Sequence, residues 1–178
     1  ISTDDVVISQ NNTTPTVDAG IDKELTCATT SVLIGTTAIA GITYIWSPTN
    51  GLSNPNIAQP TASQTGTFTL TATNTTNGCT ATDAVTITQN TTPPVANAGL
   101  DKTLTCATTS VLIGTTAVVG TTYSWLPTNG LSNPNIAQPS ASQPGTFTVT
   151  ATNTSNGCIT TDAVSVTQNI TAPVANAG

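Results

Sequence analysis

The sequence contains no histidine, no arginine and no methionine, and only Lys23 and Lys102 carry positive side chains. Histidine is the commonest general base and metal ligand, and arginine is the side chain best suited to hold phosphate, so most enzymatic and nucleotide sites are disfavoured. Charged residues make up 6% of the 178 residues, and a net charge of −6 is unsuited to neutralising a run of phosphates. We therefore expect no nucleic-acid partner. No run approaches the roughly 20 apolar residues of a membrane span, so we expect no membrane insertion.

Threonine is abundant, at 43 of the 178 positions. It is β-branched and suits a pleated, half-exposed surface. Disordered chains typically combine low hydrophobicity with high net charge, whereas 37% of this chain is apolar and charges are scarce. The composition therefore predicts an ordered β-protein.

The chain repeats itself with a period of 79 residues. Residues 12–90 and 91–169 are identical at 59 of 79 positions. Residues 1–11 resemble the last part of each repeat, and residues 170–178 resemble its beginning. We therefore predict the last strand of a preceding repeat, two complete repeats and the first strand of a following repeat, as in a window of a longer tandem array.

Alternating apolar and threonine residues in each repeat indicate strands with one buried face. The pattern is clearest over 67–73 and 84–88. Between them lies Asn77-Gly78, a pair that supplies the positive φ angles of a hairpin turn, so these two strands are expected to pair antiparallel. Earlier strands are expected at 15–19, 22–27, 31–36 and 42–47.

Strand 31–36 leaves its register open, because either Val32 with Ile34 or Leu33 alone satisfies the alternation. About seven short strands around a central tryptophan are typical of an immunoglobulin-like β-sandwich. The predicted fold class is therefore all-β, with tandem seven-stranded sandwiches in an extended array. A sandwich of this size buries only about 60% of the surface of its chain and is marginal without reinforcement.

Four cysteines, Cys27, Cys79, Cys106 and Cys158, supply two per repeat. We predict one disulfide within each repeat, Cys27–Cys79 and Cys106–Cys158, because the first cysteine ends an early strand and the second opens the last one. Such a bridge contributes roughly 4 kcal/mol in the chain-entropy model and implies an oxidising, extracellular setting. The alternative pairing, Cys79–Cys106, would join neighbouring repeats. A zinc site is disfavoured because the C-x₂-C spacing and histidine are missing.

Both repeats carry the same short motifs along their whole length. In chain order these are P-x-V/A-x-A-G-x-D-K (15–23 and 94–102), L-T-C, S-V-L-I-G-T (31–36 and 110–115), Y-x-W, P-T-N-G-L-S-N-P-N-I-A-Q-P (48–60 and 127–139), G-T-F-T, N-G-C and T-D-A-V. Their combination resembles the PKD-type (polycystic-kidney-disease-like) immunoglobulin-like repeat. In particular it is similar to the cysteine-containing form found in giant secreted adhesins and gliding-motility-associated surface proteins of Bacteroidota.

The resemblance implies a seven-stranded sandwich, export to the cell surface, and service as a spacer or adhesive stalk. One feature departs from the family. The best-known PKD repeats have an Asp-rich W-D-F-G-D-G segment, where this chain reads W-S-P-T-N-G over 46–51 without a carboxylate. A ligand or ion role of those aspartates is therefore not transferred.

The aromatic residues are predicted to fill the core of each sandwich. Their alternative is a carbohydrate-stacking platform, because residues two apart on a strand share one face. The set comprises Tyr44, Trp46 and Phe68 in the first repeat and Tyr123, Trp125 and Phe147 in the second.

Two aspartates recur in both repeats, Asp22 with Asp83 and Asp101 with Asp162. We predict that they satisfy turn amides or pair with the single lysine of each repeat. A weak structural calcium site is the alternative, although calcium takes about 6–8 oxygen ligands and two carboxylates supply few of them. No metal or cofactor is otherwise expected.

Serine and threonine abound, but without a histidine or a suitably placed lysine none is an activated nucleophile, so we predict no catalytic residue and no enzyme. The predicted function is that of a structural repeat segment of a long extracellular filament or cell-surface adhesin stalk. Its expected partners are neighbouring repeats of the same chain and, in a filament, other copies. The alternative is a carbohydrate- or protein-binding module on the Asn/Pro-rich loops 48–60 and 127–139.

Overall fold

A computed structural model describes residues 4–171. The chain is all-β and forms two β-sandwich units in tandem, Ile1–Asn90 and Thr91–Gly178, which confirms the prediction of tandem all-β sandwiches. Residues 1–3 and 172–178, which hold most of the predicted following strand, lie outside the described residues. Residues 4–11, expected to be a strand of a preceding repeat, form no strand.

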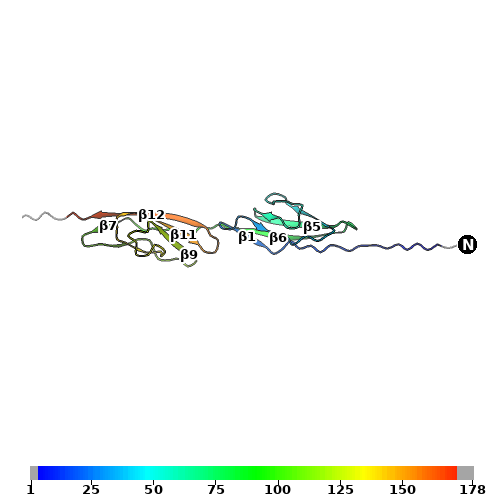
Figure 1. Ribbon diagram of the computed structural model, residues 1–178, viewed down its shortest axis with the longest axis horizontal. Coiled ribbons are helices and arrows are strands. Elements are labelled where there is room, and N and C mark those ends of the chain that lie inside the picture. Colours follow the sequence, from blue (N-terminus) through cyan, green and yellow to red (C-terminus); the bar gives the residue numbers. More distant parts are fainter. Residues whose placement is uncertain (1–3, 172–178) are drawn as a thin grey trace, which may run out of the picture. The chain divides into compact units, whose positions relative to one another are not determined.

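Each unit has six strands among its described residues. Figure 1 shows the longer strands of each unit as arrows. In the first unit they are β1 (Lys23–Thr26), β2 (Val32–Leu33), β3 (Ile42–Ser47), β4 (Thr61–Ala62), β5 (Gly66–Asn74) and β6 (Thr80–Asn90). Four of them form one sheet in the order β1-β6-β5-β3, and β2 pairs with β4 in a second, small sheet.

The second unit repeats this arrangement. Its strands are β7 (Lys102–Thr105), β8 (Val111–Leu112), β9 (Thr121–Leu126), β10 (Ser140–Ala141), β11 (Gly145–Asn153) and β12 (Ile159–Asn169). The large sheet has the order β7-β12-β11-β9, and β8 pairs with β10.

The expectation of seven strands is wrong because segment 15–19 joins no ladder in the described structure. Its backbone is held by other bonds. The Ala19 amide donates to the Asp83 carboxylate at 2.8 Å, and the Ala19 carbonyl accepts from the amide of Gly35 at 2.9 Å. Side-chain and loop contacts therefore replace ladder hydrogen bonds for this segment.

The predicted hairpin of the two long strands is present, with β5 and β6 antiparallel and Phe68 opposite Val85. Only the glycine of the Asn77-Gly78 pair has a positive φ, at 72°, and no described residue other than glycine does. In contrast, β1 pairs parallel with β6, with Lys23 opposite Ile87 and the strands ending together. This parallel pair was not anticipated from the sequence.

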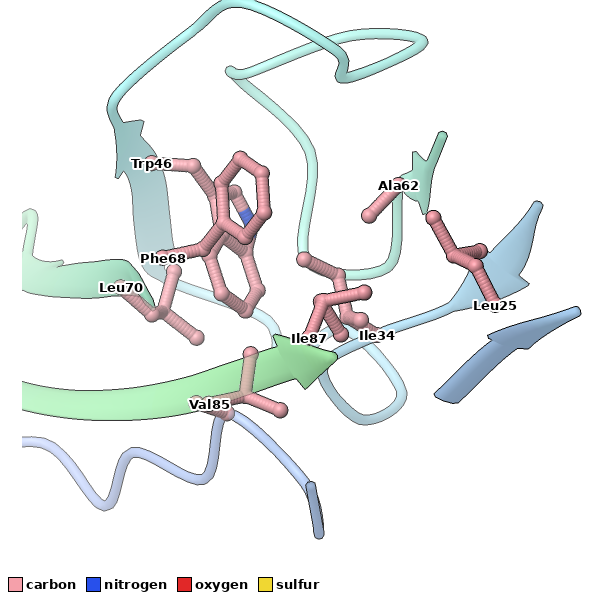
Figure 2. Close-up of a cluster of buried hydrophobic side chains, with 9 residues drawn as sticks. Leu25, Ile34, Trp46, Ala62, Phe68, Leu70, Val85 and Ile87 are labelled. Carbon is pink, nitrogen blue, oxygen red and sulfur yellow. The ribbon is translucent and has the colours of Figure 1, made fainter. Parts of the chain in front are cut away.

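The core lies between the two sheets of each unit. Trp46 of β3 and Phe68 of β5 lie side by side, flanked by Leu70, Val85 and Ile87 (Figure 2). The open register of the short strand β2 is resolved: Ile34 is 1% exposed and Leu33 is 51% exposed, so the Val32 and Ile34 side faces inward. The equivalent residues of the second unit form its core, namely Ile113, Trp125, Phe147, Val149, Val164 and Val166.

Candidate functional site: the cysteines and the two ends of each sandwich

The predicted disulfides within the repeats are wrong. Cys27 and Cys158 are disulfide-bonded, whereas Cys79 and Cys106 carry free thiols. The bridges Cys27–Cys79 and Cys106–Cys158 are therefore both contradicted, and so is the alternative pairing of Cys79 with Cys106.

The parallel pairing of β1 with β6 explains this error. Cys27 follows Thr26, which lies opposite Asn90 at the end of β6, whereas Cys79 precedes Thr80 at the start of β6. The 11 residues of β6 span roughly 33 Å at about 3.3 Å per residue. Bonded cysteines have Cα atoms no more than about 7 Å apart. The two cysteines of one repeat thus lie at opposite ends of the sandwich, too far apart to bond.

The chain enters each unit at the end that carries the second cysteine. In the first unit, the side-chain amide of Asn77 donates to the carbonyl of Thr13 at 3.0 Å and to the side chain of Asn11 at 3.1 Å. In the second unit, Asn156 donates to the carbonyl of Thr92 at 2.9 Å. Each asparagine thereby fixes the entering segment to the β5–β6 or β11–β12 turn.

This role of the asparagine was missed in the sequence, where Asn77 was assigned only to a turn. The amide group can donate and accept at once. Its oxygen accepts from the backbone amide of Cys79 at 2.9 Å while its nitrogen holds the entering chain. The N-G-C motif could have indicated this role. The glycine alone suffices for the turn, so the asparagine before it calls for another explanation.

The recurring aspartates bind backbone amides. Asp83 accepts from Ala19 and Asp22 accepts from Thr86, each at 2.8 Å. Asp162 and Asp101 repeat these bonds at the same distances. They tie the segment before the first strand to the last strand of each unit. The described residues contain no group of three or more His, Cys, Asp or Glu side chains that could hold a metal.

The aromatic side chains lie in and beside the core. Trp46 is fully buried, and its indole nitrogen donates to the carbonyl of Ile57 at 2.9 Å. A ring that is fully buried offers no face for stacking a sugar, so the platform alternative is wrong for the tryptophan. The Tyr44 ring is half-buried, and its hydroxyl accepts from the amide of Ile39 at 2.9 Å. Trp125 and Tyr123 make the same bonds with Ile136 and Val118.

The Asn/Pro-rich loop 48–60 is bonded to the sandwich at several points. Its Pro55 carbonyl accepts from the amide of Trp46 at 2.8 Å, and Asn50 donates to the side chain of Gln64 at 2.8 Å. Ile57, in contrast, is 41% exposed. The loop is therefore hydrogen-bonded to the sandwich while part of its surface is exposed to solvent.

Gly35 belongs to the S-V-L-I-G-T motif, and its position admits no side chain. Its φ is +75°, and a Cβ there would lie 2.1 Å from the carbonyl oxygen of Ala58 and 2.9 Å from the Trp46 ring. Gly114 has the same surroundings in the second unit. The motif S-V-L-I-G-T thus marks the place where loop 48–60 and the tryptophan approach the backbone.

No pocket is present in the part of the chain that the structure describes. Among the same residues, no helix is long and apolar enough to cross a membrane.

No protein-family model matches the chain, and no curated protein matches it. Several solved structures are similar in fold, some of them tandem immunoglobulin domains. Extracellular domains 3–5 of Drosophila OTK are 13% identical, with 84% of this chain and 59% of that chain covered and a TM-score of 0.41. Titin Ig tandem domains A164–A165 are 8% identical, with 85% and 93% covered and a TM-score of 0.31.

A third similar structure is a SusE-like surface-located polysaccharide-binding protein of Bacteroides thetaiotaomicron. It is 15% identical, with 84% of this chain and 33% of that chain covered and a TM-score of 0.37. The chain thus spans about a third of that protein and 59% of the OTK fragment.

Proposed function

We propose that this chain is a non-catalytic structural segment of a long extracellular filament or cell-surface adhesin stalk, in which each sandwich acts as a force-bearing spacer. The observation that carries the proposal is the path of the chain through each unit. It enters beside Asn77, at the start of β6, and leaves at Asn90, where β6 ends. Within each unit the chain therefore advances by about the length of this strand, roughly 33 Å, between its entrance and its exit.

The terminal strands of each unit are arranged to resist tension. Because β1 and β6 are parallel, a pull on both ends of the unit draws the two strands past one another. Their hydrogen bonds are then loaded together rather than opened one after another. The hydrogen bonds that the Ala19 amide donates to Asp83 and the Thr86 amide donates to Asp22 extend this contact toward the entering chain. Neutral, threonine-rich surfaces add little salt dependence, since few charges are available to be screened.

The location and family belong to the same proposal. A disulfide forms and persists in oxidising compartments, and Cys27 and Cys158 are bonded. The repeat motifs resemble PKD-type repeats of Bacteroidota surface proteins, and in a tandem array stability is roughly the sum of repeat and nearest-neighbour contributions. The proposed partners are thus the neighbouring repeats of the same chain and, in a filament, other copies.

Single-molecule force spectroscopy tests the mechanical role. A variant with Cys27, Cys79 and Cys158 replaced by serine retains one cysteine, Cys106, to which a handle can be attached in addition to the chain ends. Pulling between the two chain ends loads β7 and β12 in shear, whereas pulling between Cys106 and the C-terminus loads the same ends of both strands and unzips them. We expect a clearly higher unfolding force for the second unit in the first geometry. Equal forces in both geometries would contradict the proposal.

A binding module on loops 48–60 and 127–139 is a second candidate, favoured by the exposed Ile57 and Ile136, each 41% exposed. Paired substitutions Asn56→Ala with Asn135→Ala leave the loop anchors intact, because the loops are held by other side chains, namely those of Asn50, Ser53 and Gln59 and of their equivalents Asn129, Ser132 and Gln138. A glycan array probed with the full chain tests this function. Binding lost in this variant but kept in Thr69→Ala would favour the module.

A further inference from the structure

Each unit contains two Asn-Gly pairs, and the two lie in different surroundings. The loop pairs are residues 50–51 and 129–130, and the hairpin pairs are residues 77–78 and 156–157. An asparagine before glycine is prone to deamidation, in which the next backbone nitrogen attacks the side-chain amide carbon. Glycine favours this attack because it has no side chain to obstruct it.

Hydrogen bonds hold the hairpin pair of the first unit against this reaction. The Gly78 amide, which contains the attacking nitrogen, donates to the carbonyl of Asn74 at 2.8 Å. The Asn77 side chain accepts from the Cys79 amide at 2.9 Å and donates to the Thr13 carbonyl at 3.0 Å. Closing a ring between the nitrogen and the side chain requires both groups to move, so these bonds must break first.

The hairpin pair of the second unit is held in the same way. The Gly157 amide donates to the carbonyl of Asn153 at 2.9 Å. Asn156 accepts from the Cys158 amide and donates to the Thr92 carbonyl, each at 2.9 Å, and it is 1% exposed. Burial thus adds to the hydrogen bonds, because water has little access to the side chain.

The loop pairs lack this protection. Asn50 is exposed, and the Gly51 amide donates no hydrogen bond within the described part of the chain. Among the same residues the Asn50 side chain makes one bond, to the side chain of Gln64 at 2.8 Å, and this bond is exposed to solvent. Asn129 is exposed too and has the equivalent bond to Gln143 at 3.0 Å. The attacking nitrogen of a loop pair therefore has no bond to break.

We propose that the loop pairs are sites of spontaneous deamidation and that the fold protects the hairpin pairs from it. In the first step the Gly51 nitrogen bonds to the side-chain carbon of Asn50, and the C–N bond of the side-chain amide breaks. The departing nitrogen takes the proton of the Gly51 amide and leaves as ammonia. Water then opens the succinimide ring to aspartate or isoaspartate, so one water is consumed for each ammonia released. The inference does not depend on the proposed mechanical function.

The reaction changes the charge of the loops at a position that tolerates the change. A carboxylate at position 50 cannot donate to Gln64, but the Gln64 amide can turn and donate to it. Each event adds one negative charge to a chain whose net charge is −6. At position 77, in contrast, a carboxylate would face the Thr13 carbonyl that the amide now binds, and two acceptors cannot bond to each other.

Tryptic mapping of the full chain tests the proposal. The folded chain is incubated for several weeks at mildly alkaline pH in water enriched in heavy oxygen, which marks every site that reacts before digestion. The chain is then reduced, alkylated and digested, and electron-transfer fragmentation locates the label. Peptides 24–102 and 103–178 each contain one loop pair and one hairpin pair, so both kinds are compared in one sample.

We expect the hairpin pairs to react at least about tenfold more slowly than the loop pairs, because each hydrogen bond that must break first lowers the rate. Equal rates, or a faster reaction at the hairpin pairs, would overturn the proposal. Incubation in urea supplies the reference, since unfolding removes the hydrogen bonds, and there all four pairs are expected to react at similar rates. Loop pairs that react in urea but stay intact in the folded chain would also overturn it.

Two double variants test where the new charge is tolerated. Asn50→Asp with Asn129→Asp mimics the modified loops, and Asn77→Asp with Asn156→Asp places the same charge in the hairpin turns. Under reducing conditions, we expect the midpoint of urea unfolding to stay unchanged in the loop variant and to fall in the hairpin variant. The same midpoint in both variants would overturn the claim that only the loops tolerate the charge.

Discussion

The first and second units differ at 20 of 79 aligned positions, yet their tryptophans and recurring aspartates make equivalent hydrogen bonds. On the outer face of the third strand, the first unit has Ile45 with Ser47, whereas the second has Ser124 with Leu126. Ile45 and Leu126 are 58% and 64% exposed. An apolar side chain has thus moved by two positions along the same face without changing the strand. Buried anchors therefore specify the sandwich, whereas its outer face is free to vary.

Each unit contains one tryptophan, which makes the comparison measurable. Trp125→Phe leaves Trp46 as a fluorescent reporter of the first unit, and Trp46→Phe leaves Trp125 as a reporter of the second. Urea unfolding under reducing conditions then gives the free energy of unfolding of each unit without any contribution from a disulfide.

The largest loss is expected from removal of the shared tryptophan. Trp46→Ala empties a fully buried site and leaves the carbonyl of Ile57 without its donor. Substitutions of this kind cost about 3–5 kcal/mol, which is most of the stability of a small domain. We expect calorimetry and circular dichroism to show the first unit largely unfolded, with the Trp125 transition retained. Ile45→Ala, on the same strand but exposed, should change stability by less than about 0.5 kcal/mol. Simultaneous loss of both units would contradict independent anchoring.

The glycine beside the tryptophan comes next. Gly35 and Gly78 have nearly the same φ, 75° and 72°, but only Gly35 faces atoms that a Cβ would strike. Both alanine variants carry the cost of a left-handed backbone, about 1–2 kcal/mol. Gly35→Ala adds crowding, which costs a further 1–3 kcal/mol or so. The difference between the two variants, measured by urea unfolding of the Trp46 reporter, isolates the close approach. Equal losses would show that backbone conformation alone requires glycine.

A smaller loss is expected at the carboxylate that holds the segment before β1. Asp83→Ala removes the acceptor of the amide of Ala19, which is a fully buried residue, and bonds to charged groups contribute about 1.5–3 kcal/mol. Asp162→Ala should have the same effect on the second unit, because the bond to Ala98 has the same length. Asp22→Ala, whose bond to Thr86 is exposed, should cost less. An Asp22→Ala loss as large as that of Asp83→Ala would argue against burial as the cause.

Much of this arrangement was accessible from the sequence, and the failures have a common physical origin. Alternation predicted the hairpin strands because one face of each is buried, as Phe68 and Val85 show. The burial of Trp46 and the amide bonds of the aspartates also agree with simple rules for residue types. These are features in which a residue type and its local pattern determine the environment.

The pairing direction of a short strand has no such local signature. The sequence of β1 is compatible with a parallel or an antiparallel neighbour, and the disulfide prediction assumed that the end of one strand meets the start of the other. Parallel pairing reverses that relation, so Cys27 lies beside the end of β6 and far from Cys79. The role of Gly35 was equally hidden, because it depends on a loop more than 20 residues away in the chain, at Ala58.

The smallest expected effect concerns the core positions at which the units differ. Ile87 and Val166 are equivalent and both 2% exposed, so at this position the second core lacks a methylene that the first contains. Ile87→Val should cost the first unit about 0.5–1.5 kcal/mol. If the second core has closed around its valine, Val166→Ile will overpack it and destabilise the second unit, whereas a core that kept the space will gain stability. Each unit is followed by its own tryptophan. A lower or higher free energy of unfolding of Val166→Ile therefore separates these two cases. A loss of stability in both variants would mean that each core has packed around its own side chain. Residues could then be exchanged between the units on the outer face but not in the core.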